Sequence, residues 1–141
     1  MLFRSIALGL AQLVPDAEIW ASDTSPAAVA LAARNALRFG LSDRVHVRRG
    51  DLLEPLPGEL DLIVANLPYL PESARSRHPE LADEPEKAVF APGDGLGPYR
   101  RLFASAEERL SPGGAVLIQF HRRVLVAERE ELAAFGARLA A

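Results

Sequence analysis

The chain has 141 residues, 49% hydrophobic and 25% charged, which is enough for one folded domain with a sizeable core. The formal net charge of −3 argues against a broadly basic surface for nucleic acid. There is no cysteine, which excludes disulfides, thiolate catalysis and cysteine-ligated zinc, and no apolar run approaches the ~20 residues of a membrane span. We therefore expect a cytoplasmic protein that does not contact a membrane.

Helix and strand patterns alternate along the first half of the chain. They predict helices at 5–14 and 26–39, and strands at 17–22, 44–49 and 60–65. The second helix is well delimited, because Ser25 is a good N-cap, Pro26 suits a first helical position and Gly40 suits the position after a helix end. We expect its inner face to carry Val29, Ala30, Ala33, Ala36 and Leu37.

The second half of the chain is interrupted by many prolines and glycines. Residues 70–97 are predicted to be irregular, and a loop of that length in a compact domain is more often functional than idle. After it we expect a helix at 98–110, a turn at 111–114, a strand at 115–120 and a helix at 128–140. The helix 98–110 has apolar residues at helical spacing, namely Leu102, Phe103, Ala106 and Leu110.

This alternation predicts an α/β protein with a doubly wound, mostly parallel sheet, and residues 1–141 as one domain. Three predicted strands are followed by a polar residue at a turn: Asp23, Asp51 and Asn66. In a parallel sheet the carboxyl ends lie on one side, so we expect these groups to converge on one crevice. Each Asp taken alone is also explained as the cap of a helix or turn.

Four stretches of the sequence carry a resemblance to a known family. They are Asp23-Thr24-Ser25-Pro26, Gly50-Asp51-Leu52, Asn66-Leu67-Pro68-Tyr69 and the later run Asp94-Gly95-Leu96 with Tyr99-Arg100-Arg101. The first three resemble S-adenosylmethionine-dependent methyltransferases. Together with Glu84-Pro85, the last run makes the chain similar to the HemK/PrmC-type release-factor glutamine methyltransferases, which methylate the side-chain amide of Gln in a Gly-Gly-Gln tripeptide.

The resemblance implies a Rossmann-like class I methyltransferase fold, S-adenosylmethionine as cofactor, no metal and a release factor as protein substrate. It implies that Asp23 binds the ribose hydroxyls and that Asp51 and Leu52 frame the adenine, with Asn66 also close to the cofactor. Substrate binding and catalysis fall to the turn 66–69. The Asn66 side-chain oxygen and the Leu67 backbone carbonyl would accept hydrogen bonds from the target NH₂, on the turn that Pro68 makes, and Tyr69 would pack on the planar amide.

Both residues also have a purely structural explanation: Asn66 as a residue that favours a turn after a strand, and Tyr69 as an ordinary half-buried ring. Glu84 is a candidate for holding the substrate tripeptide, and a turn role beside Pro85 explains it equally well.

The sequence departs from the family in two places. Leu67 stands where the family usually has proline, so the turn loses a fixed φ, although Pro68 still biases Leu67 to the extended region. The family's first strand and its acidic, Gly-rich cofactor loop have no counterpart here, and neither do its last strands. We therefore expect an incomplete domain, truncated at both ends, whose strands ending at Asp23 and Asn66 lack the strand between them. Such a chain by itself would bind the cofactor weakly or not at all.

Two other functions remain open. One is methylation of the exocyclic amino group of adenine or guanine in DNA or RNA, because those enzymes share the Asn-x-Pro-Tyr pattern. An acidic chain with one lysine does not supply the basic groove that such a substrate needs. The other is a non-catalytic fragment that keeps the topology without the reaction.

Overall fold

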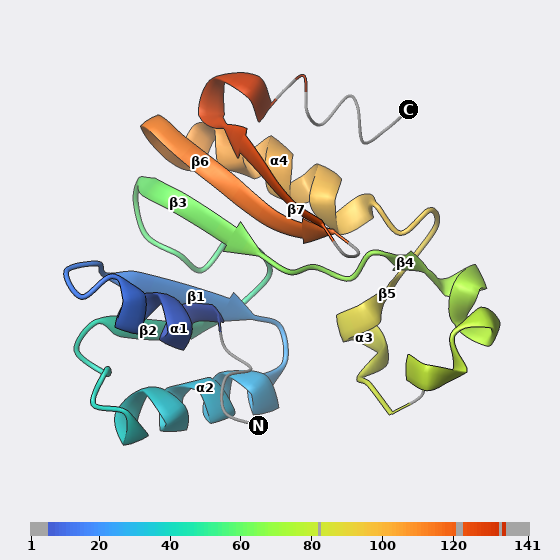
Figure 1. The fold of residues 1–141 in the computed structure, drawn as a ribbon, viewed down its shortest axis with the longest axis horizontal. Coiled ribbons are helices and arrows are strands. Elements are labelled where there is room, and N and C mark those ends of the chain that lie inside the picture. Colours follow the sequence, from blue (N-terminus) through green and yellow to red (C-terminus); the bar gives the residue numbers. More distant parts are fainter. Residues whose placement is uncertain (1–5, 82, 121–122, 133, 135–141) are drawn as a thin grey trace. The chain divides into compact units, whose positions relative to one another are not determined.

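A computed structural model of the chain describes residues 6–81, 83–120, 123–132 and 134. The chain separates into two compact units, Met1–Pro57 and Gly58–Ala141 (Figure 1). Each unit is described in its own frame. The assignment of residues 1–141 to a single domain stays a prediction.

The first unit alternates helix and strand as predicted. Its elements are α1 (Ile6–Leu13), β1 (Ile19–Asp23), α2 (Pro26–Arg38) and β2 (Val45–Arg49). Strands β1 and β2 pair in parallel, with Ile19 opposite Val45 and Asp23 opposite Arg49. One buried cluster joins both helices to β2, and it consists of Ala7, Leu8, Ala11, Ala36 and Val45.

Local interactions fix the ends of the two helices. The Ser25 side chain accepts a hydrogen bond from the Ala28 amide at 3.3 Å, and Pro26 opens α2, as the sequence predicts. At the end of α1 the Arg44 guanidinium donates to the Ala11 carbonyl at 2.8 Å and to the Ala17 carbonyl at 3.1 Å. Arg44 thus satisfies one of the four carbonyls that a helix end leaves without a partner.

The inner face predicted for α2 is partly wrong. Ala36 is buried and Val29 is half-buried, but Ala30, Ala33 and Leu37 are exposed. The inward stripe instead contains Ala32 and Phe39, both half-buried. Because alanine occurs on every side of this helix, its apolar periodicity is too weak to indicate which side is buried.

The second unit contains more elements than the sequence predicts. They are β3 (Leu60–Ala65), β4 (Leu70–Pro71), 3-10 helices Glu72–Arg77 and Pro79–Leu81, α3 (Glu86–Val89), β5 (Phe90–Ala91), α4 (Gly97–Arg109), β6 (Leu110–Phe120), β7 (Arg123–Glu128) and a 3-10 helix Arg129–Glu131. The main sheet has the order β3-β6-β7, in which β3 and β6 are parallel and β7 is antiparallel to β6. Strands β4 and β5 form a separate parallel pair.

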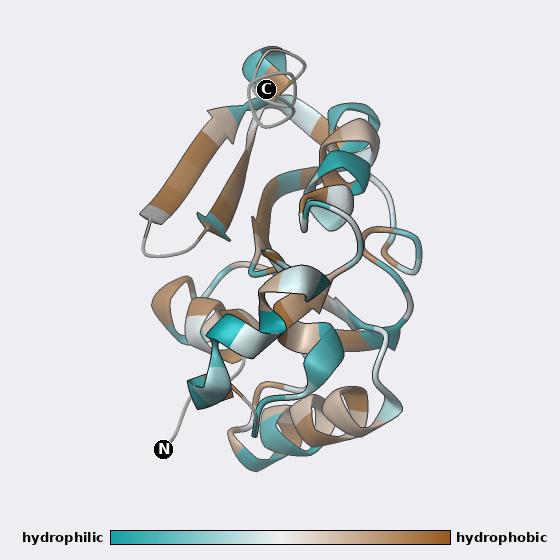
Figure 2. Cartoon of the chain, turned by 90° about the vertical axis from the view of Figure 1, so that its right-hand side faces the viewer, coloured by the Kyte–Doolittle hydropathy of each residue, from teal (hydrophilic) through white to brown (hydrophobic). Residues whose placement is uncertain are grey.

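Helix α4 and the main sheet provide the core of the second unit. Leu102, Phe103 and Ala106, which the sequence places at helical spacing, are buried on α4, while Leu110 is buried at the start of β6. The sheet and the chain after it contribute Val116, Ile118, Ala127 and Leu132. Figure 2 shows the central residues of β6 and β7 in the hydrophobic colours. Each large apolar side chain buried in this way contributes about 1.5–3 kcal/mol, so this layer fixes α4 against the sheet.

Three predictions about this unit need correction. Residues 70–97 are not simply irregular, because they fold into the short elements β4, α3 and β5 and two 3-10 helices. The predicted turn 111–114 lies inside β6, where the pairing with β3 shifts from Leu60–Leu110 to Leu62–Ala115, and Gly113 has a φ of +77°. Residues 123–128, given no structure from the sequence, form β7.

The helix expected at 128–140 lies largely outside the described residues. Its described start is different, because Glu128 ends β7 and Arg129–Glu131 form a 3-10 helix.

Within the described part of the chain, β1 pairs only with β2, and β3 pairs only with β6. Each of these two strands therefore has one edge without a described partner, which matches the incomplete sheet predicted from the sequence. Among the described residues, no helix combines the length and apolar character that crossing a membrane requires.

Candidate functional site

The carboxyl ends of β1 and β2 lie together in the first unit. Asp23 is the last residue of β1 and is exposed, and its Oδ1 accepts a hydrogen bond from the Ser25 amide at 2.8 Å. The Gly50 amide donates to the Asp23 backbone carbonyl at 3.1 Å. This bond places the start of the segment after β2, and with it Asp51, beside the end of β1.

Leu52 has an unusual backbone conformation at this edge. Its φ is +45°, and it is the one non-glycine residue with positive φ in the described chain. The conformation costs about 1–2 kcal/mol for an L-residue with a side chain. The Ser22 hydroxyl donates to the Leu52 carbonyl at 2.5 Å, which stabilises this geometry. Backbone strain at a sheet's carboxyl edge is typical of a ligand-binding segment.

The structure thus brings Asp23, Asp51 and Leu52 together. The Asp23 carboxylate at the end of β1 is exposed, so it is accessible to a ligand. The binding of the ribose by Asp23 and of the adenine by Asp51 and Leu52 stays a prediction. In the described part of the chain, no group of three or more His, Asp or Glu side chains is arranged to hold a metal ion.

The turn 66–69 follows β3 in the second unit. Asn66 is exposed, while Leu67, Pro68 and Tyr69 are half-buried. None of the described residues forms a hydrogen bond with the Asn66 side chain, so its amide is available to a ligand. The convergence of Asn66 with Asp23 and Asp51 on one crevice stays a prediction, because Asn66 belongs to the other unit.

The Leu67 backbone carbonyl is held by a residue of α4. The Tyr99 hydroxyl lies 3.0 Å from this carbonyl oxygen and 3.0 Å from that of Gln119 in β6. Tyr99 is fully buried. Burial raises the pKa of Tyr99 to about 12, against a lowering from the Leu67 hydrogen bond, so the hydroxyl keeps its proton at neutral pH.

The loop before α4 packs against the chain that follows Tyr69. Gly95 has a φ of +84°, and a Cβ at this position would lie 2.6 Å from the Tyr69 carbonyl oxygen and 2.9 Å from the Pro71 nitrogen. Asp94 fixes the loop by accepting from the Leu96 amide at 3.0 Å and from both terminal nitrogens of Arg100 at 3.1 and 2.6 Å. The Asp94-Gly95-Leu96 run therefore packs directly against the backbone at the end of the turn 66–69.

This run and Tyr99 carry part of the family resemblance, but the sequence alone predicts no role for them. The one local indication is Gly95 itself, which lies between an aspartate and the start of a helix. A glycine in such a place often marks a positive φ or a close backbone approach. The bond from Tyr99 to Leu67 spans 32 residues, and no local pattern predicts it.

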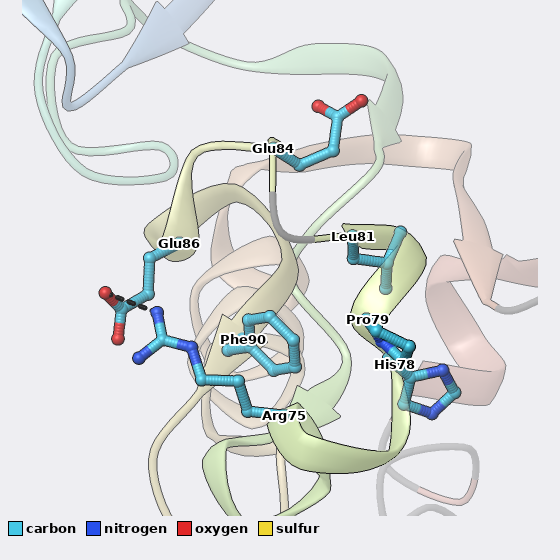
Figure 3. A pocket seen from close by; sticks show the side chains of 7 residues that line it. All are labelled: Arg75, His78, Pro79, Leu81, Glu84, Glu86 and Phe90. Carbon is cyan, nitrogen blue, oxygen red and sulfur yellow. Dashed lines mark ion pairs between the residues drawn. The ribbon is translucent and has the colours of Figure 1, made fainter.

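A shallow cavity of about 380 Å³ lies in the segment between β4 and β5. Figure 3 shows the side chains that line it, among them the Phe90 ring and the ion pair of Arg75 and Glu86, 2.6 Å apart. The His78 Nδ1 lies 3.0 Å from Glu80. Glu84 lines the same cavity, and its role in holding a substrate tripeptide stays a prediction.

Comparison with known proteins identifies the family. The family model of the RMKL-like methyltransferase domain matches residues 6–80, just over half of the chain. The chain belongs to this methyltransferase-domain family.

Two curated relatives indicate which methyltransferases this chain is similar to. The chain is 43% identical over 117 residues to the release factor glutamine methyltransferase of Moorella thermoacetica, covering 82% of this chain and 41% of the relative. It is 38% identical over 130 residues to the ribosomal protein uL3 glutamine methyltransferase of Neisseria gonorrhoeae, covering 90% and 44%. The chain thus spans about two fifths of the length of these relatives. They confirm the resemblance to the HemK/PrmC type.

A solved structure confirms the fold. A methyltransferase from Pyrococcus furiosus superposes with a TM-score of 0.60 over 94% of this chain and 56% of that chain, at 18% identity. The Rossmann-like class I methyltransferase fold, with a mostly parallel and incomplete sheet, is therefore confirmed.

Proposed function

We propose that this chain carries the amide-binding turn and part of the cofactor site of an S-adenosylmethionine-dependent methyltransferase that acts on glutamine in the Gly-Gly-Gln tripeptide of release factors. The observation that carries the proposal is the turn 66–69. It presents the exposed Asn66 amide and the held Leu67 carbonyl at the carboxyl end of β3.

The chemistry of an amide substrate explains why two acceptors are needed. A carboxamide nitrogen is a poor nucleophile, because its lone pair is delocalised into the carbonyl. Two fixed oxygens, from Asn66 and Leu67, can each accept one N–H of the target NH₂ and so orient the nitrogen. The same oxygens stabilise the positive charge that develops on nitrogen during transfer. Positioning supplies much of the remaining rate acceleration, and no strong base is needed on this turn.

The first unit supplies the proposed cofactor contacts. S-adenosylmethionine, when bound, supplies a methyl group on a sulfonium. The Asp23 carboxylate would accept hydrogen bonds from the ribose hydroxyls, while Asp51 and Leu52 would frame the adenine. The hydrogen bond from Ser22 to Leu52 and the bond from Gly50 to Asp23 keep these residues in place without the ligand.

The tripeptide of a release factor is the substrate we favour. A relative at 38% identity is named for ribosomal protein uL3, so a glutamine of that protein is the second candidate. Both substrates require the same amide chemistry at the turn 66–69. Either substrate belongs to the translation machinery, which would place this protein in the cytoplasm.

A substrate panel tests the proposal. The full-length gene product is incubated with labelled S-adenosylmethionine and, in separate reactions, with a release factor, with ribosomal protein uL3, with DNA and with RNA. We expect transfer to the release factor and none when its Gly-Gly-Gln glutamine is changed to alanine. Transfer to uL3 alone would favour the second candidate, and transfer to nucleic acid alone would overturn both. No transfer to any of them would overturn the proposal.

A further inference from the structure

A buried tyrosine reaches the amide-binding turn from helix α4. Tyr99 is fully buried, and its hydroxyl lies 3.0 Å from the Leu67 carbonyl oxygen and 3.0 Å from the Gln119 carbonyl oxygen. A buried tyrosine that served packing alone would need only one partner for its hydroxyl. Here the hydroxyl instead bridges the chain after β3 to the end of β6.

The stoichiometry of this contact leaves the Leu67 carbonyl able to bind a ligand. A phenolic hydroxyl has one hydrogen, so at any moment it donates to only one of the two carbonyls. A carbonyl oxygen has two lone pairs, so the Leu67 oxygen can accept from Tyr99 and from a second donor together. The bond from Tyr99 therefore sets the direction of this oxygen and does not block it.

The neighbouring rings extend the contact to Tyr69. The Phe120 ring packs edge-on against Tyr99, with centroids 5.6 Å apart and planes at 85°, and against Tyr69 at 5.8 Å and 61°. Both separations lie in the range that aromatic pairs favour. Tyr99 thus contacts one end of the turn through its hydroxyl and the other end through Phe120.

We propose that Tyr99 is a positioning residue, whose hydroxyl holds the Leu67 carbonyl in the direction that the substrate amide needs. Leucine at position 67 does not fix φ as a proline ring would, so the hydrogen bond from Tyr99 adds a constraint on this carbonyl from a distant part of the sequence. This inference rests on the proposed function, in which the Leu67 carbonyl accepts one N–H of the glutamine amide.

Tyr99→Phe tests the inference, because it removes the hydroxyl and keeps the ring against Phe120. Methyl transfer to the release factor is measured with the full-length gene product below the unfolding temperature of each variant. We expect kcat to fall by about 10- to 100-fold, since small misplacements of reacting groups have effects of this size. KM should change less than threefold. Replacement of Tyr99 by 4-aminophenylalanine, which restores an N–H donor at the same place, should recover most of the lost rate.

Ser105→Ala is the matched control. It removes a hydroxyl from the same helix that bonds to the carbonyls of Arg101 and Leu102 and not to the turn. Its kcat should equal that of the wild type. An unchanged kcat in Tyr99→Phe, with an active wild type, would overturn the inference and leave the proposed function standing. A loss that the amino analogue does not recover would also overturn it, because the missing hydrogen-bond donor would then not be its cause. A wild type inactive on the release factor would overturn both.

Discussion

Gly95 approaches Tyr69 so closely that a Cβ at position 95 would lie 2.6 Å from the Tyr69 carbonyl oxygen. The neighbouring contacts of that Cβ would also be backbone atoms, so no flexible side chain can move aside. The two residues lie 26 positions apart in the sequence. The contact places the loop before α4 directly behind the turn 66–69, and it requires glycine at position 95.

We predict that Gly95→Ala destabilises the protein more than Gly93→Ala. Both glycines have positive φ, +84° and +66°, so both variants lose about 1–2 kcal/mol from backbone strain. Only Gly95 faces other atoms, and overlap there should add about 1–3 kcal/mol. Urea unfolding of the two variants measures the difference. Equal losses would show that the close approach has no energetic consequence.

The ion pair of Asp94 and Arg100 predicts that the stability of the folded state decreases at acid pH. The hydrogen bonds from Arg100, and then that from the Leu96 amide, lower the pKa of Asp94 from 3.8 to about 2. The Asp94 carboxyl therefore binds a proton more weakly in the folded state than in the unfolded state. The stabilisation is complete above about pH 4 and is lost as the pH falls through about 2.

A carboxyl NMR titration of Asp94 measures this pKa directly. Arg100→Gln should return it towards 3.8. Arg101→Gln removes an equal charge from the next residue of α4, which has no part in the shift, and should leave the pKa near 2. A titration of Asp94 at its ordinary value in the wild type would contradict the prediction.

Tyr99 predicts a second pH dependence, at the alkaline end. Its folded pKa is about 12, mainly because of burial, against 10 for a tyrosine in the unfolded chain. Its contribution to stability is therefore complete below pH 10 and is lost as the pH rises through 12. The chain has two tyrosines, so tyrosinate absorbance should show one late step, and Tyr99→Phe should remove that step. Ionisation of both tyrosines before pH 11 would contradict the burial of Tyr99.

Asn66→Ala should separate function from stability. Asn66 is exposed, and none of the described residues forms a hydrogen bond with its side chain. The free energy of unfolding should therefore change by less than about 0.5 kcal/mol. Methyl transfer should fall by about 10²- to 10³-fold, the usual effect of removing one preorganised hydrogen-bonding group. Ser73→Ala, an exposed position in the next 3-10 helix, is the control and should keep full activity. Loss of folding in Asn66→Ala would show a structural role instead.

The sequence predicts the elements that have strong local signals. Ser25 and Pro26 mark the start of α2, and the apolar run before Asn66 marks β3, and both boundaries agree with the structure. Residues 124–127 are also apolar, but the sequence alone predicts no strand there. Their strand pairing with β6 is a tertiary preference, which local reasoning about helices does not reveal.

In the candidate site, too, the sequence predicts some features and not others. Polar residues at strand ends, such as Asp23 and Asn66, are visible from the pattern, because each follows a strand and precedes a turn. The support behind them is not visible. The bond from Tyr99 to Leu67 and the approach of Gly95 to Tyr69 depend on how α4 packs, and packing joins residues far apart in the chain.

The most direct test of the account is the position of the methyl group on the product. A release factor is incubated with the full-length gene product and S-adenosylmethionine, digested, and sequenced by mass spectrometry. We predict one methyl group, on the side-chain amide of the Gly-Gly-Gln glutamine. A methyl group on another residue, or an unmodified tripeptide after complete incubation, would contradict the assignment of the turn 66–69 as its amide-binding site.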